Sequence, residues 1–218
     1  MNSANILLIH CDQLRFDCLG VNGHPLVQTP NLDRLASEGA NFSQAYTPAP
    51  ICSPARACLL TGQWSFQHGC ISTPGNELYR PAGKDIPVFS TLLKNAGYRL
   101  GWVGKFHKEV TGHPGDWGFD DFIGERGYGQ WREQQPLPPK PHENSWFGEA
   151  DTAIAPEQSK LAWGADMVIS LLDDYQADDA PFFLRWDPSE PHLPNVVPEP
   201  YVSMYKSSDI EPWPSYGD

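Results

Sequence analysis

The stretch "NILLIHCDQLR", residues 5–15, joins a short apolar run directly to a polar segment. A continuous apolar run of this length is typical of a strand buried on both faces of a parallel sheet. Ligands of open α/β sheets bind just beyond the carboxyl ends of such strands. Asp12 lies three residues after the run, so this stretch indicates both a fold class and a first candidate site residue.

Helix and strand patterns alternate along the rest of the chain. Helices are predicted over residues 29–39, 53–62, 87–97 and 157–176. Thr29 and Ser53 are expected as N-caps of the first two, and Phe89, Leu92, Leu93 and Ala96 as the inward face of the third. Strands are predicted in "YRLGWVG", residues 98–104, and "PFFLRW", residues 181–186. The alternation predicts an α/β fold with a mainly parallel or mixed sheet flanked by helices.

Polar residues follow each of the predicted strands. The three strand ends deliver Asp12, then Lys105 with His107, and finally His192 in "DPSEPHLP". A lone histidine is more often a hydrogen-bonded core residue, and a lone aspartate a turn residue. Because the carboxyl ends of parallel strands share one edge of the sheet, we expect these side chains to form one site.

Two regions do not fit the alternation. Residues 124–157 form a long segment, rich in glycine, proline and tryptophan, that has no periodicity. Loops this long are usually functional or disordered, and we expect this one to face the substrate. Residues 187–218 are proline-rich and extended, without a closing strand or helix, so the fold is expected to be incomplete at its C-terminus.

Composition excludes several classes of function. The formal charge of −12 disfavours nucleic-acid binding, and no apolar run reaches the length of a membrane span. The five cysteines form no C-x-x-C pair, which disfavours a disulfide framework and a cysteine-rich zinc site. The N-terminus lacks the features of a signal peptide, so a cytoplasmic location is expected.

The stretch "PAPICSPARACLLTGQ", residues 48–63, places Cys52 at the start of a predicted helix. Cys52 could be a buried structural thiol, a catalytic thiolate or the precursor of another group. The positive helix end and nearby Arg56 would favour a thiolate. A thiolate phosphatase needs a longer spacing than the three residues between Cys52 and Arg56, and Pro54 removes one backbone donor. The spacing therefore disfavours the thiolate.

"CSPAR" followed by "ACLLTGQ" resembles the C-x-P-x-R signature of the type I sulfatases, in the alkaline phosphatase superfamily. Four other segments resemble the family in the same order: "NILLIHCDQ", "TPNLDRLASEGANFSQAY", "GYRLGWVGKFHK" and "PFFLRWDPSEPHLPNVVPEPY". The resemblance implies an alkaline-phosphatase-like fold. It also implies that residues 1–218 are the N-terminal part of a sulfatase catalytic domain.

The resemblance implies that Cys52 is a precursor. A formylglycine-generating enzyme would oxidise it to formylglycine, whose hydrated diol attacks the sulfur of a small-molecule or carbohydrate sulfate ester. Asp12, Gln13 and the group at position 52 would bind a divalent metal, with Ca²⁺ expected and Mn²⁺ or Mg²⁺ as alternatives.

The remaining site residues also take their roles from the resemblance. Arg56 would hold the diol, and Lys105 would bind a sulfate oxygen. His107 would be the base that releases sulfate. His192 would contact the sulfate and assist the leaving group.

The chain departs from the family pattern at Gln13, where many members carry a second aspartate. Asp-Gln also occurs in choline-sulfatase-like and phosphonate monoester hydrolase-like relatives, which leaves a phosphonate monoester or phosphodiester hydrolase as an alternative. Bulky Phe106, Trp117 and Phe119 are expected near the rim, and a narrow pocket favours sulfate monoesters. Further metal ligands and a second lysine come, in the family, from beyond residue 218, so a truncated, non-catalytic chain is a third possibility.

Overall fold

A computed structural model describes residues 3–141 and 148–212 of the chain. Its centre is a four-stranded, wholly parallel sheet in the order β1-β5-β2-β3. The strands are β1 (Ile6–Ile9), β2 (Arg99–Gly104), β3 (Asp121–Gly124) and β5 (Phe182–Asp187). The predicted α/β fold with a parallel sheet is confirmed.

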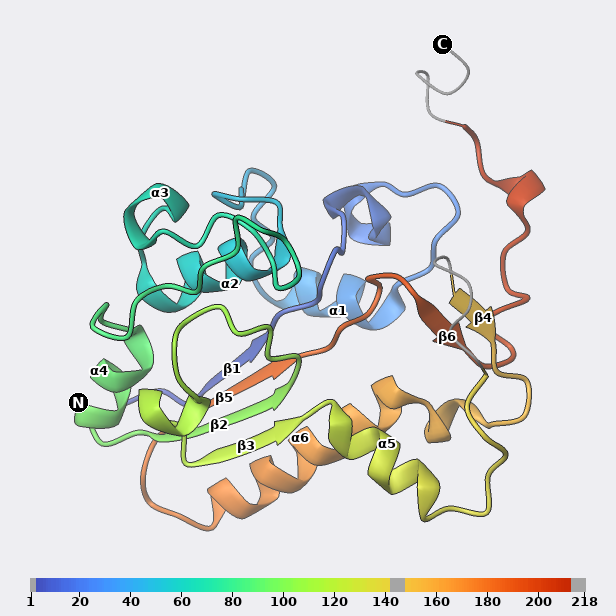
Figure 1. The fold of residues 1–218 in the computed structure, drawn as a ribbon. Coiled ribbons are helices and arrows are strands. Elements are labelled where there is room, and N and C mark those ends of the chain that lie inside the picture. The colour runs from blue at the N-terminus through green and yellow to red at the C-terminus, as the bar shows by residue number, and fades with distance from the viewer. Residues whose placement is uncertain (1–2, 142–147, 213–218) are drawn as a thin grey trace.

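Helices cover both faces of this sheet (Figure 1). On one face lie α2 (Cys52–Thr61), α3 (Ser65–His68) and α4 (Phe89–Asn95), and on the other lies α6 (Lys160–Gln176). Alternate side chains of the strands supply the two cores: Leu100 and Trp102 pack in the first, and Val103 and Leu184 in the second. Both faces are thus buried, which explains why the central strands β2 and β5 are mostly apolar, with Arg185 and Asp187 as buried exceptions in β5.

The predicted helices are present, but α2 begins at a different residue and α4 turns different residues toward the core than expected. The helix α2 begins at Cys52 with Ile51 as its N-cap, so the prediction that Ser53 caps it was wrong. The Ser53 hydroxyl instead donates a hydrogen bond to the carbonyl of His107, 3.0 Å away. In α4, Leu92 is 65% exposed rather than turned inward, and Ala96, the C-cap, is also exposed, because Phe89 and Leu93 are the residues that pack on the core.

The segments 124–157 and 187–218 hold more regular structure than the sequence indicates. The first contains α5 (Arg126–Glu133) and β4 (Gly148–Ala150), and β4 pairs in parallel with β6 (Asn195–Val197) of the second. The predictions of an aperiodic loop and of an end without a strand were therefore wrong. Two glycines and only two buried residues in α5 conceal its periodicity. Residues 142–147 lie outside the described residues.

The first helix, α1 (Pro30–Glu38), begins at the expected proline after Thr29. Short 3₁₀ helices span Phe16–Cys18, Gly20–Asn22, Pro114–Trp117, Pro156–Gln158 and Ser207–Asp209. None of the helices within residues 3–141 and 148–212 combines the length and the apolar character that a membrane crossing requires.

Candidate active site

The candidate site lies where β1, β2 and β5 end and α2 begins. Asp12 follows β1, Lys105 follows β2, and Cys52 is the first residue of α2. Gly104 allows the strand ends to approach, because its φ is +104° and a Cβ there would lie 2.2 Å from the carbonyl oxygen of Asp187. A cavity of about 620 Å³ opens here, lined among others by Asp12, Gln13, Cys52, Arg56 and His192.

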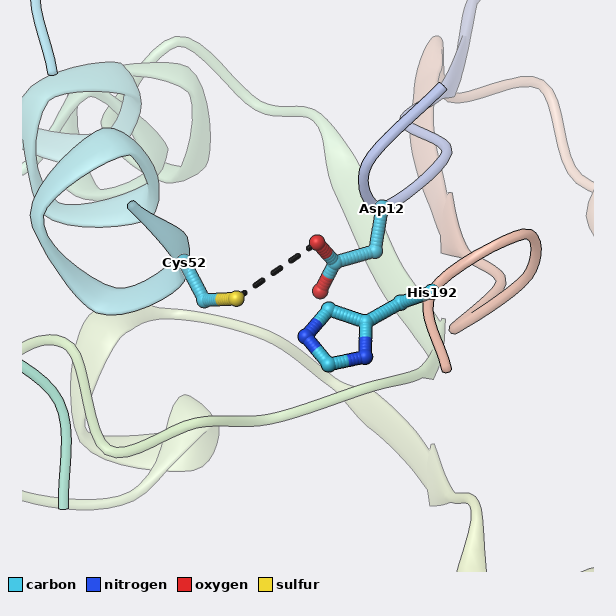
Figure 2. Close-up of side chains that lie close together, drawn as sticks. All are labelled: Asp12, Cys52 and His192. Atoms are coloured by element: carbon cyan, nitrogen blue, oxygen red, sulfur yellow. Dashed lines mark hydrogen bonds between the residues drawn. The ribbon is translucent and has the colours of Figure 1, made fainter. Parts of the chain in front are cut away.

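The carboxylate of Asp12 contacts three other side chains of this site. Its Oδ2 accepts hydrogen bonds from Lys105 Nζ at 2.5 Å and Arg56 Nη2 at 3.1 Å. Its Oδ1 lies 3.5 Å from the Sγ of Cys52 (Figure 2). Burial alone would raise the pKa of Asp12, but the hydrogen bond from Lys105 and the charge of Arg56 hold it below its usual value. Asp12 is therefore an ionised acceptor with one oxygen facing the cavity.

The Cys52 side chain lines the cavity beside Asp12, but it is a thiol rather than a thiolate. Its Sγ lies 3.5 Å from Asp12 and 4.0 Å from Lys105 Nζ. Burial raises the pKa of the Cys52 thiol above its ordinary value, and the attraction of Lys105 does not offset this. The thiol is protonated near neutral pH, which argues against the thiolate alternative as the spacing did.

Arg56 is clamped between two carboxylates. Besides Asp12, it donates from Nη1 to Asp187 Oδ2 at 3.0 Å and to the carbonyl of Lys105 at 3.4 Å. The side chain is buried and cannot be deprotonated. Because Arg56 lies four residues after Cys52 on α2, the helix brings both to the same side, as the sequence predicted.

The two histidines differ in their state. Burial, together with the charges of Lys105 and Arg56, lowers the pKa of His107 to about 4. His107 is therefore neutral near pH 7 and able to accept a proton. His192 Nδ1 lies 2.5 Å from the carbonyl oxygen of Leu193, which can only accept, so this nitrogen carries the proton.

The structure brings Asp12, Cys52, Arg56, Lys105 and His192 together around one point. Gln13 lines the same cavity with a φ of +62°, a backbone conformation that non-glycine residues adopt mainly at constrained, often functional positions. His107 lies close enough to feel the charges of Lys105, Arg56, Asp12 and His192, although it does not line the cavity.

Asp187 was missed by the sequence analysis although it contacts Arg56 directly. It is the last residue of β5, at the same edge of the sheet as Asp12. The rule that selected Asp12 could therefore have selected Asp187 as well. Glu109 was also missed, and its carboxylate accepts a hydrogen bond from the backbone N–H of His107 at 2.9 Å.

The expected aromatic rim is part of the core instead. Trp117 and Phe119 are buried, and Phe106 packs against Trp102 with ring centroids 5.8 Å apart. The prediction that these rings narrow the pocket was wrong, because they cluster on Trp102 on one face of the sheet. Their size therefore carries no information about the substrate.

The side chains around the cavity provide some of the ligands that a metal ion would need. Single ligand atoms of Asp12, Cys52 and His192 lie within 4.8 Å of one another (Figure 2). Because Arg56 and Lys105 both bind Oδ2 of Asp12, Oδ1 is the oxygen left for a cation. Asp12 with the amide of Gln13 fits one side of a hard-cation site, short of the roughly six to eight oxygens that Ca²⁺ prefers.

A parallel sheet that brings a carboxylate, two cations and a helix-terminal cysteine to one edge is the arrangement expected of an alkaline-phosphatase-like hydrolase. The family model described as Sulfatase matches residues 4–215. An arylsulfatase of Clostridium perfringens is 32% identical, over 98% of this chain and 48% of its own length. The N-acetylgalactosamine-6-sulfatase of Canis lupus familiaris is also 32% identical, over 91% and 41%. The chain belongs to the sulfatase family, within the alkaline phosphatase superfamily.

A solved structure agrees with this assignment. The phosphonate monoester hydrolase of Agrobacterium radiobacter matches 97% of this chain with a TM-score of 0.75 and 25% sequence identity, over 45% of its own length. The chain thus spans less than half of the length of each of these three relatives.

Proposed function

We propose that the protein is a sulfuric ester hydrolase whose nucleophile is a formylglycine made from Cys52. The observation that carries the proposal is the placement of Cys52 Sγ 3.5 Å from Asp12, inside C-S-P-A-R, with Arg56 fixed beside it. The similarity to an arylsulfatase over 98% of the chain supports the same reaction. A protonated thiol is also the form expected of a precursor rather than of a nucleophile.

Formylglycine would supply a geminal diol. One hydroxyl would attack sulfur and break the bond between sulfur and the alcohol oxygen, so that the alcohol leaves; loss of the proton of the second hydroxyl would then expel sulfate and regenerate the aldehyde. The chain's own residues would orient and charge this group. Arg56, held by two carboxylates, stabilises negative charge on the nucleophile, and Lys105 attracts a sulfate oxygen. His107 is neutral and can take the proton of the second hydroxyl.

His192 would act on the far side of the sulfate. Because its Nδ1 faces the carbonyl of Leu193, Nε2 is the ring nitrogen left to contact the sulfate ester. Nε2 is therefore the ring nitrogen that would assist the leaving alcohol.

We propose that Ca²⁺ occupies the site, with Mn²⁺ and Mg²⁺ as alternatives. Asp12 through Oδ1, Gln13 through its amide oxygen and the group at position 52 would hold it. The ion would lower the pKa of the diol that it binds. Arg56 and Lys105 offset the negative charge of Asp12. An anionic substrate would therefore meet little repulsion from this carboxylate.

The substrate would be a small-molecule or carbohydrate sulfate ester, and a formylglycine-generating enzyme would be the partner during maturation. The name of the relative N-acetylgalactosamine-6-sulfatase supports a sulfated sugar. A second candidate function is the hydrolysis of phosphonate monoesters or phosphodiesters with the same nucleophile. The Asp12-Gln13 pair and the likeness to a phosphonate monoester hydrolase support this alternative.

The test uses the full-length protein, produced together with a formylglycine-generating enzyme. We expect a higher kcat/KM for 4-nitrophenyl sulfate than for a 4-nitrophenyl phenylphosphonate, because Lys105 and Arg56 suit a compact anion without a second organic substituent. Cys52→Ala should abolish turnover, whereas Cys58→Ala, on the same helix, should not. A clear preference for the phosphonate would establish the second candidate, and full activity of Cys52→Ala would refute both.

A further inference from the structure

A group of fully buried charges lies beneath the candidate site. Asp187, Arg185 and Glu109 all have no exposed surface, and each is close to a residue of the site or to another member of the group. Nothing in the proposed reaction requires charge at this depth. A buried ion pair is weak evidence for stability, because apolar residues of similar size are often as stabilising. The group therefore calls for a functional explanation.

Asp187 lies within ion-pair distance of side chains from α2, from β5 and from the residue after β1, and of these contacts the one with Arg56 has the geometry of a hydrogen bond. Its Oδ2 lies 3.0 Å from Arg56 Nη1 on α2 and 2.6 Å from Arg185 Nη2 on β5. Its Oδ1 lies 3.2 Å from His10 Nδ1, directly after β1. Its backbone is fixed as well, since its carbonyl accepts a hydrogen bond from the N–H of Lys105 at 2.8 Å. Asp187 is thus a rigid acceptor at the floor of the site.

Arg185 supports this acceptor from inside the sheet. Its guanidinium stacks over the ring of Trp102, 4.1 Å from the centroid, and lies 3.9 Å from Glu109 Oε1. It makes no contact with Asp12 or Cys52 in the described part of the chain. Arg185 therefore balances buried negative charge, whereas Asp187 is the group that touches Arg56.

The two carboxylates on Arg56 have opposite effects on its position. Asp12 draws Nη2 toward the cavity, while Asp187 draws Nη1 toward the floor. Without Asp187, Nη1 would keep only its 3.4 Å contact with the carbonyl of Lys105, and the guanidinium could rotate to bind Asp12 with both nitrogens, in the fork geometry that arginine favours with carboxylates. It would then compete with Lys105 and with a cation for Asp12.

We propose that Asp187 is a positioning residue of the hydrolysis reaction, which fixes Arg56 so that its guanidinium faces the nucleophile at position 52. This inference rests on the proposed function. It predicts that the loss of activity follows residue 187 rather than the neighbouring buried charge at residue 185. If the role of Asp187 were only to balance buried charge, substitutions at residues 187 and 185 would reduce activity equally.

The kinetic test compares three variants of the full-length, formylglycine-bearing protein: Asp187→Asn, Arg185→Met and the double variant. For Asp187→Asn we expect kcat to fall about 10- to 100-fold, as for other residues that orient a catalytic group, and KM to change less than about threefold. Arg185→Met should be less stable to heat but keep kcat within about threefold, because Asp187 still binds Arg56 and His10.

The double variant distinguishes the effect of Asp187 on the position of Arg56 from its effect on the balance of buried charge. Its kcat should stay as low as that of Asp187→Asn, because Arg56 still lacks the carboxylate at residue 187 whichever buried charges remain. Recovery of kcat together with stability would overturn the proposal. So would a loss of kcat in Arg185→Met as large as that in Asp187→Asn.

A crystal structure of Asp187→Asn provides a readout independent of turnover. We expect Arg56 Nη1 to leave residue 187 and both guanidinium nitrogens to bind Asp12. An unmoved Arg56 would overturn the inference whatever the kinetics. If the unaltered protein hydrolyses neither sulfates nor phosphonates, the proposed function fails, and the position of Arg56 in this structure still decides the inference.

Discussion

The hydrogen bond from Ser53 to His107 gives the sharpest prediction about how the two halves of the site are joined. Ser53 is fully buried on α2, and its hydroxyl donates to the carbonyl of His107 at 3.0 Å. Because residue 53 is a free position in C-x-P-x-R, Ser53→Ala should leave the conversion of Cys52 unchanged. The substitution therefore tests the link between the nucleophile's helix and the segment that carries the base.

The magnitude follows from the contact. Loss of an average hydrogen bond costs about 1 kcal/mol, and a buried acceptor left without a donor costs up to about 3 kcal/mol. Within the described residues, Ser53 is the donor to this carbonyl, so we expect a decrease in the free energy of unfolding of about 1–3 kcal/mol. Movement of His107 should also lower kcat about 10-fold or more.

Thr61→Ala provides the matched control. The Thr61 hydroxyl donates to the carbonyl of Ala57 at 2.7 Å and accepts from the backbone N–H of Gln63 at 3.2 Å, so its removal affects α2 and the turn that follows it but not the segment that carries His107. Urea unfolding and steady-state kinetics of both variants would measure the two effects. If Ser53→Ala unfolds and turns over like Thr61→Ala, the carbonyl has found another partner and the link does not matter.

Three further predictions concern the nucleophile, the base and the metal. With a formylglycine-generating enzyme, peptide mass spectrometry should detect an aldehyde at Cys52 and at none of the four other cysteines, because none of them has a proline at +2, although Cys11 has Arg15 at +4; an unmodified Cys52 in active protein would exclude formylglycine. The pKa of His107 is lowered to about 4, so the unfolded chain binds more protons between about pH 4 and the ordinary pKa near 6.5. The stability due to neutral His107 is therefore complete above that ordinary value and decreases as the pH falls toward 4, and metal-free His107→Asn protein should show a shallower decrease in urea unfolding; an identical slope would contradict the shift. Residues 1–218 produced alone should bind Ca²⁺ weakly in calorimetry and be almost inactive, because Asp12 and Gln13 supply too few oxygens; tight binding with rapid hydrolysis would reveal ligands missed within the chain.

The sequence alone determined the fold class and much of the candidate site. An apolar run that ends in Asp12 indicates a buried parallel strand, and the spacing of Cys52 and Arg56 places both on one side of a helix. These predictions held because the period of a helix or strand is a local property of the backbone, and because the ends of parallel strands share one edge. The order of five family-like segments was then sufficient to indicate the family.

Tertiary structure alone decided the partners of these residues. The pairing of Asp187 with Arg56 joins residues 131 positions apart, and β4 pairs with a strand from the far end of the chain. Phe106, Trp117 and Phe119 could have lined a rim, and only packing on Trp102 made them core. Local periodicity says which face of an element is apolar, but not which distant side chain meets it. That depends on the register of the strands and on the packing of helices across the sheet, which involve the whole chain at once.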